Sequence, residues 1–97
     1  KSLLLGEGVD DNMLADIKNK VESQPAVEEA GKILTMYIGP HSLLVNLDVC
    51  FKKGTTDTQI HDSVKNIEQS IRSSYPECTR IYIEAQALNP ENRQGCE

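Results

Sequence analysis

The sequence predicts a single α+β domain whose elements follow the order helix, strand, strand, helix, strand. Two segments repeat apolar residues at helical intervals, and three others alternate apolar with polar residues as strands do. A chain of 97 residues has room for one hydrophobic core, since independent domains typically reach about 100 to 150 residues. We expect the domain to span residues 10–88, after a linker at residues 1–9 and before a flexible polar tail at residues 89–97.

The first helix is predicted between Asp10 and Gln24. Asp10 and the two residues after it supply side-chain oxygens that cap a helix start. Pro25 ends the helix because proline lacks an amide proton. The apolar face of this helix consists of Met13, Leu14, Ile17 and Val21.

Two strands, at residues 30–38 and 43–52, are predicted to form an antiparallel hairpin around a turn at residues 39–42. The second strand has the clearest alternation in the chain, with an apolar residue at every odd position from Leu43 to Phe51. In the first strand, we assign Leu34, Met36 and Ile38 to one side and Ile33, Thr35 and Tyr37 to the other.

A second and longer helix is predicted to begin after Thr56 and to end before Pro76. Thr56 and Gln59 form a capping-box pattern, which satisfies two free backbone donors at a helix start. A third strand is predicted at residues 80–85. The inward side chains of these two elements are Ile60, Val64, Ile67, Ile71 and Tyr75 in the helix and Ile81, Ile83 and Ala85 in the strand.

A strand–helix–strand crossover is almost always right-handed, so the third strand is expected to run parallel to the second. The result is a truncated ferredoxin-like (metallochaperone-like) αββαβ sandwich, with a three-stranded mixed sheet and two helices on one face. The other face of the sheet would be covered by a second copy of the chain. We expect that face to carry Ile33, Tyr37, Leu44 and Tyr82.

Charge and hydropathy exclude several classes of function. Lysine and arginine number 10 and aspartate and glutamate 15, which gives a net charge of −5 and argues against a nucleic-acid partner. No apolar run approaches the ~20 residues of a membrane span, and no signal peptide opens the chain. Cys50, Cys78 and Cys96 form no C-x-x-C motif and are odd in number, so we expect reduced cytosolic thiols.

No arrangement typical of catalysis is predicted either. The spacing suggests no Cys-His or Ser-His pair, and there is no phosphate-binding glycine loop. Paired carboxylates such as Glu28 and Glu29 are adjacent in sequence, so they do not converge on a regular element. We expect a domain that binds and assembles, not an enzyme.

Several segments resemble one known family when their order and spacing are taken together. The hairpin from Thr35 to Val49, the helix and turn from Ile67 to Pro76, and the strand from Ile81 to Glu84 are similar to the cytosolic C-terminal domain of cation diffusion facilitators, which are proton-coupled exporters of divalent metals. The segment from Lys1 to Glu7 looks like the linker that leaves the last transmembrane helix of that family.

The resemblance implies a homodimer on the cytoplasmic side of the cell (inner) membrane, joined to a transmembrane domain of the same chain. Such domains often bind a divalent metal ion near the dimer interface. His61 matches a helix position where metal-binding members carry a histidine ligand, and Glu84 falls where the family often carries His-x-Glu or His-x-Asp. Here Glu84-Ala85-Gln86 departs from that pattern. Neutral imidazole and carboxylate ligands bind zinc, manganese, iron and similar ions, so these ligands do not determine which metal is bound.

Asp48 is the third candidate ligand, because it lies on the outward side of its strand and would complete a site with His61 and Glu84 if a dimer brings the three together. The alternative for His61 and Asp48 is an ordinary solvated side chain. Asn46 and Lys32 stand where some family members carry a histidine, and neither replaces one well. His41 is expected to be solvent-exposed, and Cys50 and Cys78 to be small, partly buried side chains and not ligands.

Two other interpretations stay open on these residues. The domain would serve as a dimerisation scaffold without a metal site of its own if the sensing site has been lost. It would otherwise be a free-standing ferredoxin-like module that binds a small ligand or a metal. The lack of C-x-x-C argues against a copper chaperone.

Overall fold

The computed structural model describes residues 11–87 and confirms the predicted element order. The elements are α1 (Asp11–Glu22), β1 (Val27–Gly39), β2 (Ser42–Phe51), α2 (Asp57–Ser74) and β3 (Cys78–Ala87). The linker predicted at 1–9 and the tail predicted at 89–97 lie outside the described residues.

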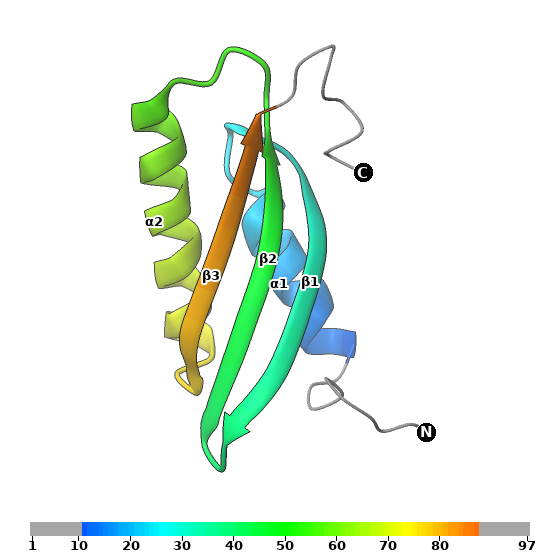
Figure 1. Cartoon of the computed structure of the whole chain (residues 1–97). Coiled ribbons are helices and arrows are strands. Elements are labelled where there is room, and N and C mark those ends of the chain that lie inside the picture. The colour runs from blue at the N-terminus through cyan, green and yellow to red at the C-terminus, as the bar shows by residue number, and fades with distance from the viewer. Residues whose placement is uncertain (1–10, 88–97) are drawn as a thin grey trace.

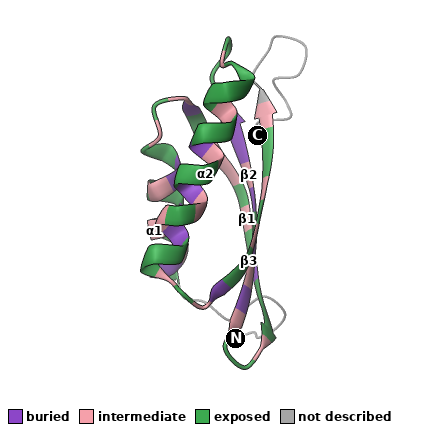
Figure 2. Ribbon diagram, turned by 90° about the vertical axis from the view of Figure 1, so that its left-hand side faces the viewer, coloured by how far each residue is buried: buried purple, intermediate pink, exposed green. Residues whose placement is uncertain are grey.

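The sheet has the strand order β1-β2-β3, with β2 antiparallel to β1 and parallel to β3, as predicted. Both helices cover the same face of this sheet, so the domain has two layers (Figures 1 and 2). The other face of the sheet carries no helix. The fold is therefore the three-stranded α+β sandwich that the sequence predicts.

The core lies between the two helices and the inner face of the sheet. The odd positions of β2 supply its centre, because their side chains all point toward the helices. The buried core residues are Met13, Ile17, Val21, Val27, Leu43, Val45, Leu47, Val49, Phe51, Ile67, Ile71 and Cys78.

Helix α2 begins with the capping box that the sequence predicts. The Thr56 hydroxyl accepts a hydrogen bond from the Gln59 amide at 3.1 Å, and the Gln59 side chain accepts one from the Thr56 amide at 2.9 Å. The helix ends where Tyr75 donates its backbone N–H to the Ile71 carbonyl, one residue before Pro76. Both boundaries follow from local sequence chemistry.

In β1, Leu34 and Met36 lie on one side and Ile33, Thr35 and Tyr37 on the other, as predicted, but the side expected to face outward is the one that faces the core. Thr35 is only 7% exposed and faces the core, whereas Leu34 and Met36 are 56% and 52% exposed on the outer face. The cause is Ile38, an extra residue in the hairpin: Gly39 pairs with Ser42, but Tyr37 and not Ile38 pairs with Leu43. One extra residue moves every side chain of a strand to the opposite face.

A second irregularity, nearer the start of β1, again changes which residues of the strand point inward, so that Ala30 faces the helices. Ala30 pairs with Val49 and Ile33 pairs with Leu47, so Gly31 and Lys32 together oppose the single residue Asp48. This two-against-one pairing is a β-bulge. It places Gly31, which has no side chain, beside Asp48.

The two aromatic residues expected on the outer face divide between the two sides. Tyr82 lies on the outer face, as predicted. Tyr37 faces the helix side but is 48% exposed, because the hairpin end extends past the helices (Figure 2). Ile33 is also on the inner side, where it packs against the core. Ala85, which was expected to be buried, points inward beside Val49 and is nevertheless exposed.

Candidate functional site

The outer face of the sheet is divided into an apolar part and an acidic part. Toward the hairpin, the register aligns two rows of side chains across the three strands, Leu34–Asn46–Tyr82 and Met36–Leu44–Arg80. The Arg80 guanidinium donates a hydrogen bond to the Tyr82 hydroxyl at 3.3 Å along this surface. Large apolar side chains that are about half exposed therefore lie together next to one cation.

The acidic part consists of the two candidate carboxylates. Asp48 on β2 and Glu84 on β3 are direct partners in the parallel register, so their side chains project from the same face. Adjacent strands lie about 4.8 Å apart, which makes the two carboxylates neighbours. Glu84 is exposed and Asp48 half-buried. Such a pair of like charges attracts cations and repels a second acidic group.

Gly31 packs closely against Asp48. A Cβ atom placed on Gly31 would lie 2.9 Å from the Asp48 Cβ, a separation that real side chains do not reach. The bulge in β1 therefore brings the backbone of Gly31 so close to Asp48 that only glycine fits there without a shift. This contact was not predicted from the sequence, in which a lone glycine within a strand is the only signal for it.

His61 does not join the carboxylate pair within one chain. It is exposed in the second turn of α2, and α2 covers the inner face of the sheet (Figure 1). The start of α2 and the end of β3 lie at the same end of the domain, because α2 runs back from the end of β2 to the start of β3. His61 and Glu84 thus share an end of the molecule but belong to different layers.

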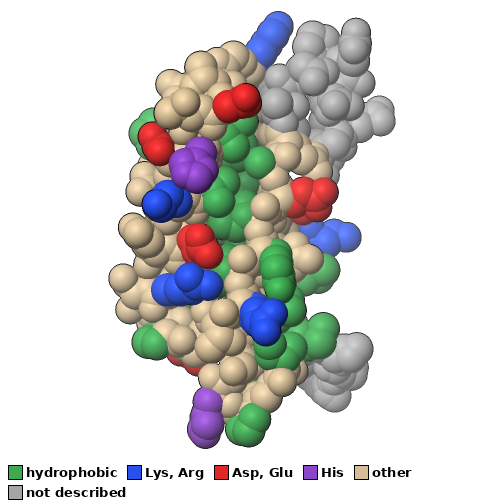
Figure 3. All heavy atoms as spheres, turned by 60° about the vertical axis from the view of Figure 1, so that its left-hand side comes forward, with side chains coloured by type: hydrophobic (Ala, Val, Ile, Leu, Met, Phe, Trp, Pro, Cys, Tyr) green, Lys and Arg blue, Asp and Glu red, His purple; other side chains and the backbone are tan. Residues whose placement is uncertain are grey.

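The exposed face of α2 is polar. Charged side chains of both signs and a histidine lie on it beside a run of hydrophobic side chains (Figure 3). Across residues 11–87, no group of three or more histidine, cysteine, aspartate or glutamate side chains is close enough to hold a metal ion. Asp48, Glu84 and His61 of one chain therefore do not form a three-ligand group among these residues.

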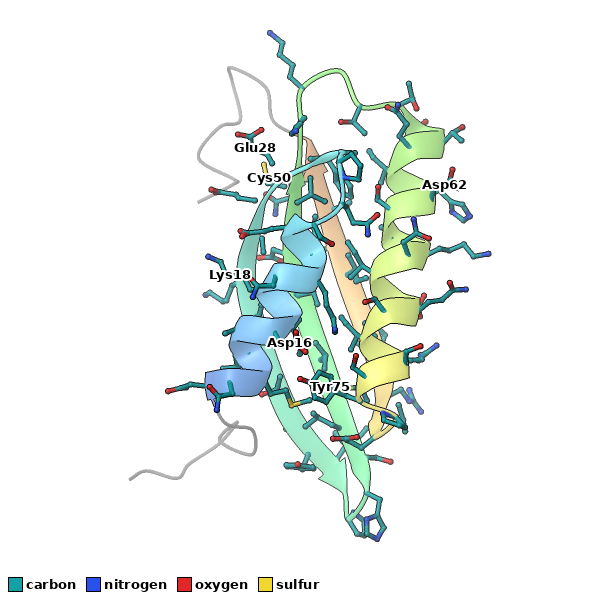
Figure 4. The ribbon with its side chains drawn as sticks, turned by 180° about the vertical axis from the view of Figure 1, so that it is seen from behind. Asp16, Lys18, Glu28, Cys50, Asp62 and Tyr75 are labelled. Carbon is teal, nitrogen blue, oxygen red and sulfur yellow. The ribbon has the colours of Figure 1, made fainter. Side chains whose placement is uncertain are left out.

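The cysteines provide no further ligand in the part of the chain that the structure describes. Cys78 is buried, and burial, with the nearby Glu77 carboxylate, raises the pKa of its thiol to about 11. The thiol is therefore protonated at neutral pH and is a poor ligand. Cys50 is also buried, at the end of β2 (Figure 4), and is disulfide-bonded. The expectation of reduced thiols is wrong for Cys50, and Cys96 lies outside the described residues.

Two further residues occupy the positions expected for them. His41 is exposed at the tip of the hairpin, and Asn46 is exposed on the outer face between the apolar and the acidic part.

Neither helix between residues 11 and 87 has the length and hydropathy that crossing a bilayer requires.

Comparison with known protein families identifies the family of this domain. Residues 9–86 match the family model described as cation efflux protein, cytoplasmic domain. The chain belongs to this family. Its members are domains of cation diffusion facilitator transporters, so the role of the family is cation efflux and not catalysis. A search of curated protein sequences gives no match.

Solved structures show the same fold in another cation diffusion facilitator. A variant of the MamM CTD in its nickel form has a TM-score of 0.72 and 15% identity, covering 82% of this chain and 100% of that chain. Variants in a copper form and in a cadmium form each have a TM-score of 0.71 and 14% identity, covering 81% of this chain and 98% of that chain. At such identity the similarity establishes the ferredoxin-like fold of this cation efflux domain.

Proposed function

We propose that this domain joins two copies of a proton-coupled divalent cation exporter through the outer face of the sheet, and that a cation held by Asp48 and Glu84 favours the joined state. The observation that carries the proposal is the position of half-exposed apolar side chains beside two neighbouring carboxylates on the same face. The transported ion would cross the membrane through a transmembrane domain of the same chain. The domain described here would lie on the cytoplasmic side of the inner membrane.

The apolar part supports a second copy as the occupant. Leu34, Met36 and Tyr82 are each about half exposed in one chain, and burying such side chains is the main source of free energy in association. Most soluble homo-oligomers are two-fold dimers in which the same patch meets itself. A two-fold pairing of the outer faces would bury these residues and bring the acidic parts of the two copies toward a common interface.

The acidic part supports a cation as the effector. Two copies would contribute four carboxylates, whose mutual repulsion opposes close approach until a cation neutralises it. Carboxylate oxygens are hard ligands, so the donor set fits manganese, iron or zinc better than a soft ion. His61 is a further candidate ligand, available where the interface extends around the β3 edge to α2.

The effect on dimerisation would be graded. Moving an equilibrium from 1:99 to 99:1 needs about 5.5 kcal/mol of differential binding. A site of a few carboxylates that are open to water supplies only part of that. We therefore expect the metal to bias a dimer that also forms without it.

Sedimentation velocity tests the dimer. Met36→Glu places a charge on the outer face and should give a monomer, while Tyr37→Glu, at a neighbouring position of similar exposure on the other side of the strand, should leave the dimer intact. Equal dissociation by both variants would refute the outer face as the interface.

Calorimetric titration of the chain with zinc, manganese and iron(II) tests the metal. Asp48→Asn should abolish the heat of binding, and His61→Ala reports whether the imidazole contributes. No heat with any ion would leave a dimerisation scaffold, the alternative favoured by the lack of a three-ligand group within residues 11–87. A free-standing module is the remaining alternative, and several apolar spans in the gene upstream of Lys1 would exclude it.

A further inference from the structure

We propose that this domain has a second ligand site, a pocket between the α1–β1 turn, the β2–α2 loop and α2, which binds the phosphate group of a small soluble molecule. The pocket lies on the helix side of the sheet, away from the outer face. It therefore involves neither the proposed dimer interface nor the carboxylate pair, and the two proposals stand or fall separately.

The pocket has a volume of about 410 Å³ and is formed by three segments that are distant in sequence. These are the α1–β1 turn at residues 24–26, the β2–α2 loop at residues 52–55, and one side of the first half of α2. Ligand pockets typically measure about 300 to 1,000 Å³, so the space suits a small molecule.

Hydrogen bonds between these segments hold the pocket open in a defined shape. The Lys52 backbone N–H donates to the Ala26 carbonyl at 2.9 Å, which fixes the loop to the turn. The Asn66 side chain donates to the Gln24 side chain at 3.4 Å, which joins α2 to the α1–β1 turn. The walls thus exist before any ligand arrives, which lowers the entropy cost of binding.

Ser63 is the feature that points to a ligand. It lines the pocket on the buried side of α2 and is only 6% exposed. Within residues 11–87, no hydrogen bond involves its hydroxyl, although a helical serine can bond to the carbonyl one turn before it. A buried hydroxyl without a partner costs free energy. Its neighbours in the same stripe of α2 are core residues such as Ile67, so an apolar residue would fit the fold better.

The charges at the pocket favour an anion. Lys52 and Lys53 lie on one wall, and only Asp62 opposes them, in a chain whose net charge is −5. Two ammonium groups, a hydroxyl and the amide side chains provide the donors that phosphate oxygens accept.

A soluble phosphate ester fits better than a lipid headgroup, although the chemistry of recognition is the same. The chain is acidic overall, and an anionic membrane surface repels it. The pocket also carries Asp62 opposite its two lysines, so it is not a uniformly basic patch of the kind that binds an anionic membrane surface.

The test is an NMR titration of the isotope-labelled chain with inorganic phosphate at constant ionic strength, with sodium chloride as the reference. Shifts should be confined to amides of residues 24–26, 52–55 and the first half of α2. Ser63→Ala should weaken binding about tenfold, as expected for a hydrogen bond to a charged group, while the melting temperature stays the same or rises. Scattered shifts, or unchanged affinity in Ser63→Ala, would overturn the proposal.

Charge variants provide matched controls. Lys53→Gln should weaken phosphate binding, Asp62→Asn should strengthen it, and Lys65→Gln, on the exposed side of α2 outside the pocket, should leave it unchanged. Equal losses in Lys53→Gln and Lys65→Gln would show non-specific attraction and refute the site. Sedimentation with phosphatidylcholine vesicles containing phosphatidate should show no binding; binding that depends on Lys53 would overturn the assignment to a soluble ligand.

Discussion

Gly31 lies directly against Asp48, so closely that a methyl group on Gly31 would stand 2.9 Å from the Asp48 Cβ. The contact arises from the bulge that sets two residues of β1 against one residue of β2. It couples the packing of an edge strand to the carboxylate that we propose as a metal ligand. A change at Gly31 should therefore affect both the stability of the sheet and the site.

Gly31→Ala is expected to destabilise the domain by about 1–3 kcal/mol, the usual cost of overpacking. The cost comes from the contact, because the backbone of Gly31 does not adopt a positive φ. Urea denaturation measures it. Gly39→Ala is the control, since a Cβ there would meet Ser42 at an ordinary 3.6 Å, and it should cost less than about 0.5 kcal/mol. Equal effects of the two variants would contradict the contact as the cause.

Asp48→Asn should have opposite effects on the dimer with and without metal. In chelator, loss of one of two adjacent negative charges should tighten the dimer by up to about fivefold, since exposed charge pairs contribute about 0.2–1 kcal/mol. With metal, the same variant should lose the added stabilisation. Sedimentation equilibrium measures both, and Glu68→Gln, which removes a charge from α2 instead, should change neither. A weaker dimer in chelator would count against repulsion at this pair.

How far the sequence predicted this fold depended on which residues carried an unambiguous signal. The alternation in β2 predicts only a strand, and the capping box at Thr56 predicts only a helix start. Both predictions are confirmed. Strand β1 has apolar residues on both sides, so alternation alone does not set its phase. Which side of β1 faces the core depends on one extra residue, Ile38, and no local propensity predicts that this residue is unpaired.

The candidate site was predictable only in part, for a related reason. Asp48 and Glu84 followed from strand alternation, which places both on the outer face. The separation of His61 from them depends on which layer α2 occupies, a property of the whole fold. The pocket at Ser63 was missed because one serine in an amphipathic helix is an ordinary observation until its burial is known.

Tyr75→Phe is expected to destabilise the domain at neutral pH but not in acid. The Tyr75 hydroxyl donates a 2.7 Å hydrogen bond to the Asp16 carboxylate, joining α2 to α1 (Figure 4). This bond, together with Lys20 at 3.4 Å, lowers the pKa of Asp16 below its ordinary value. A depressed carboxyl pKa contributes stability that is present above the unfolded-state pKa and lost as the pH falls through the folded-state value.

The difference between Tyr75→Phe and the parent chain should therefore shrink as the pH falls below about 4, the ordinary aspartate pKa. Urea midpoints measured at several pH values provide the comparison. Tyr37→Phe serves as the control, since Tyr37 is half exposed on β1 and takes no part in the hydrogen bond that joins α2 to α1. A difference that persists unchanged in acid would show that Tyr75 acts through packing and not through the carboxylate.

Loss of the capping box should weaken α2 in a non-additive way. Thr56→Ala removes the acceptor for the Gln59 amide and is expected to cost about 1 kcal/mol. Gln59→Ala removes the reciprocal bond to the Thr56 amide. Because each side chain positions the other, the double variant should cost less than the sum of the two single variants. Thr58→Ala, at an exposed position of the same turn, should cost little. Denaturant melts of the four variants measure the coupling, and strict additivity would show that the two bonds act independently.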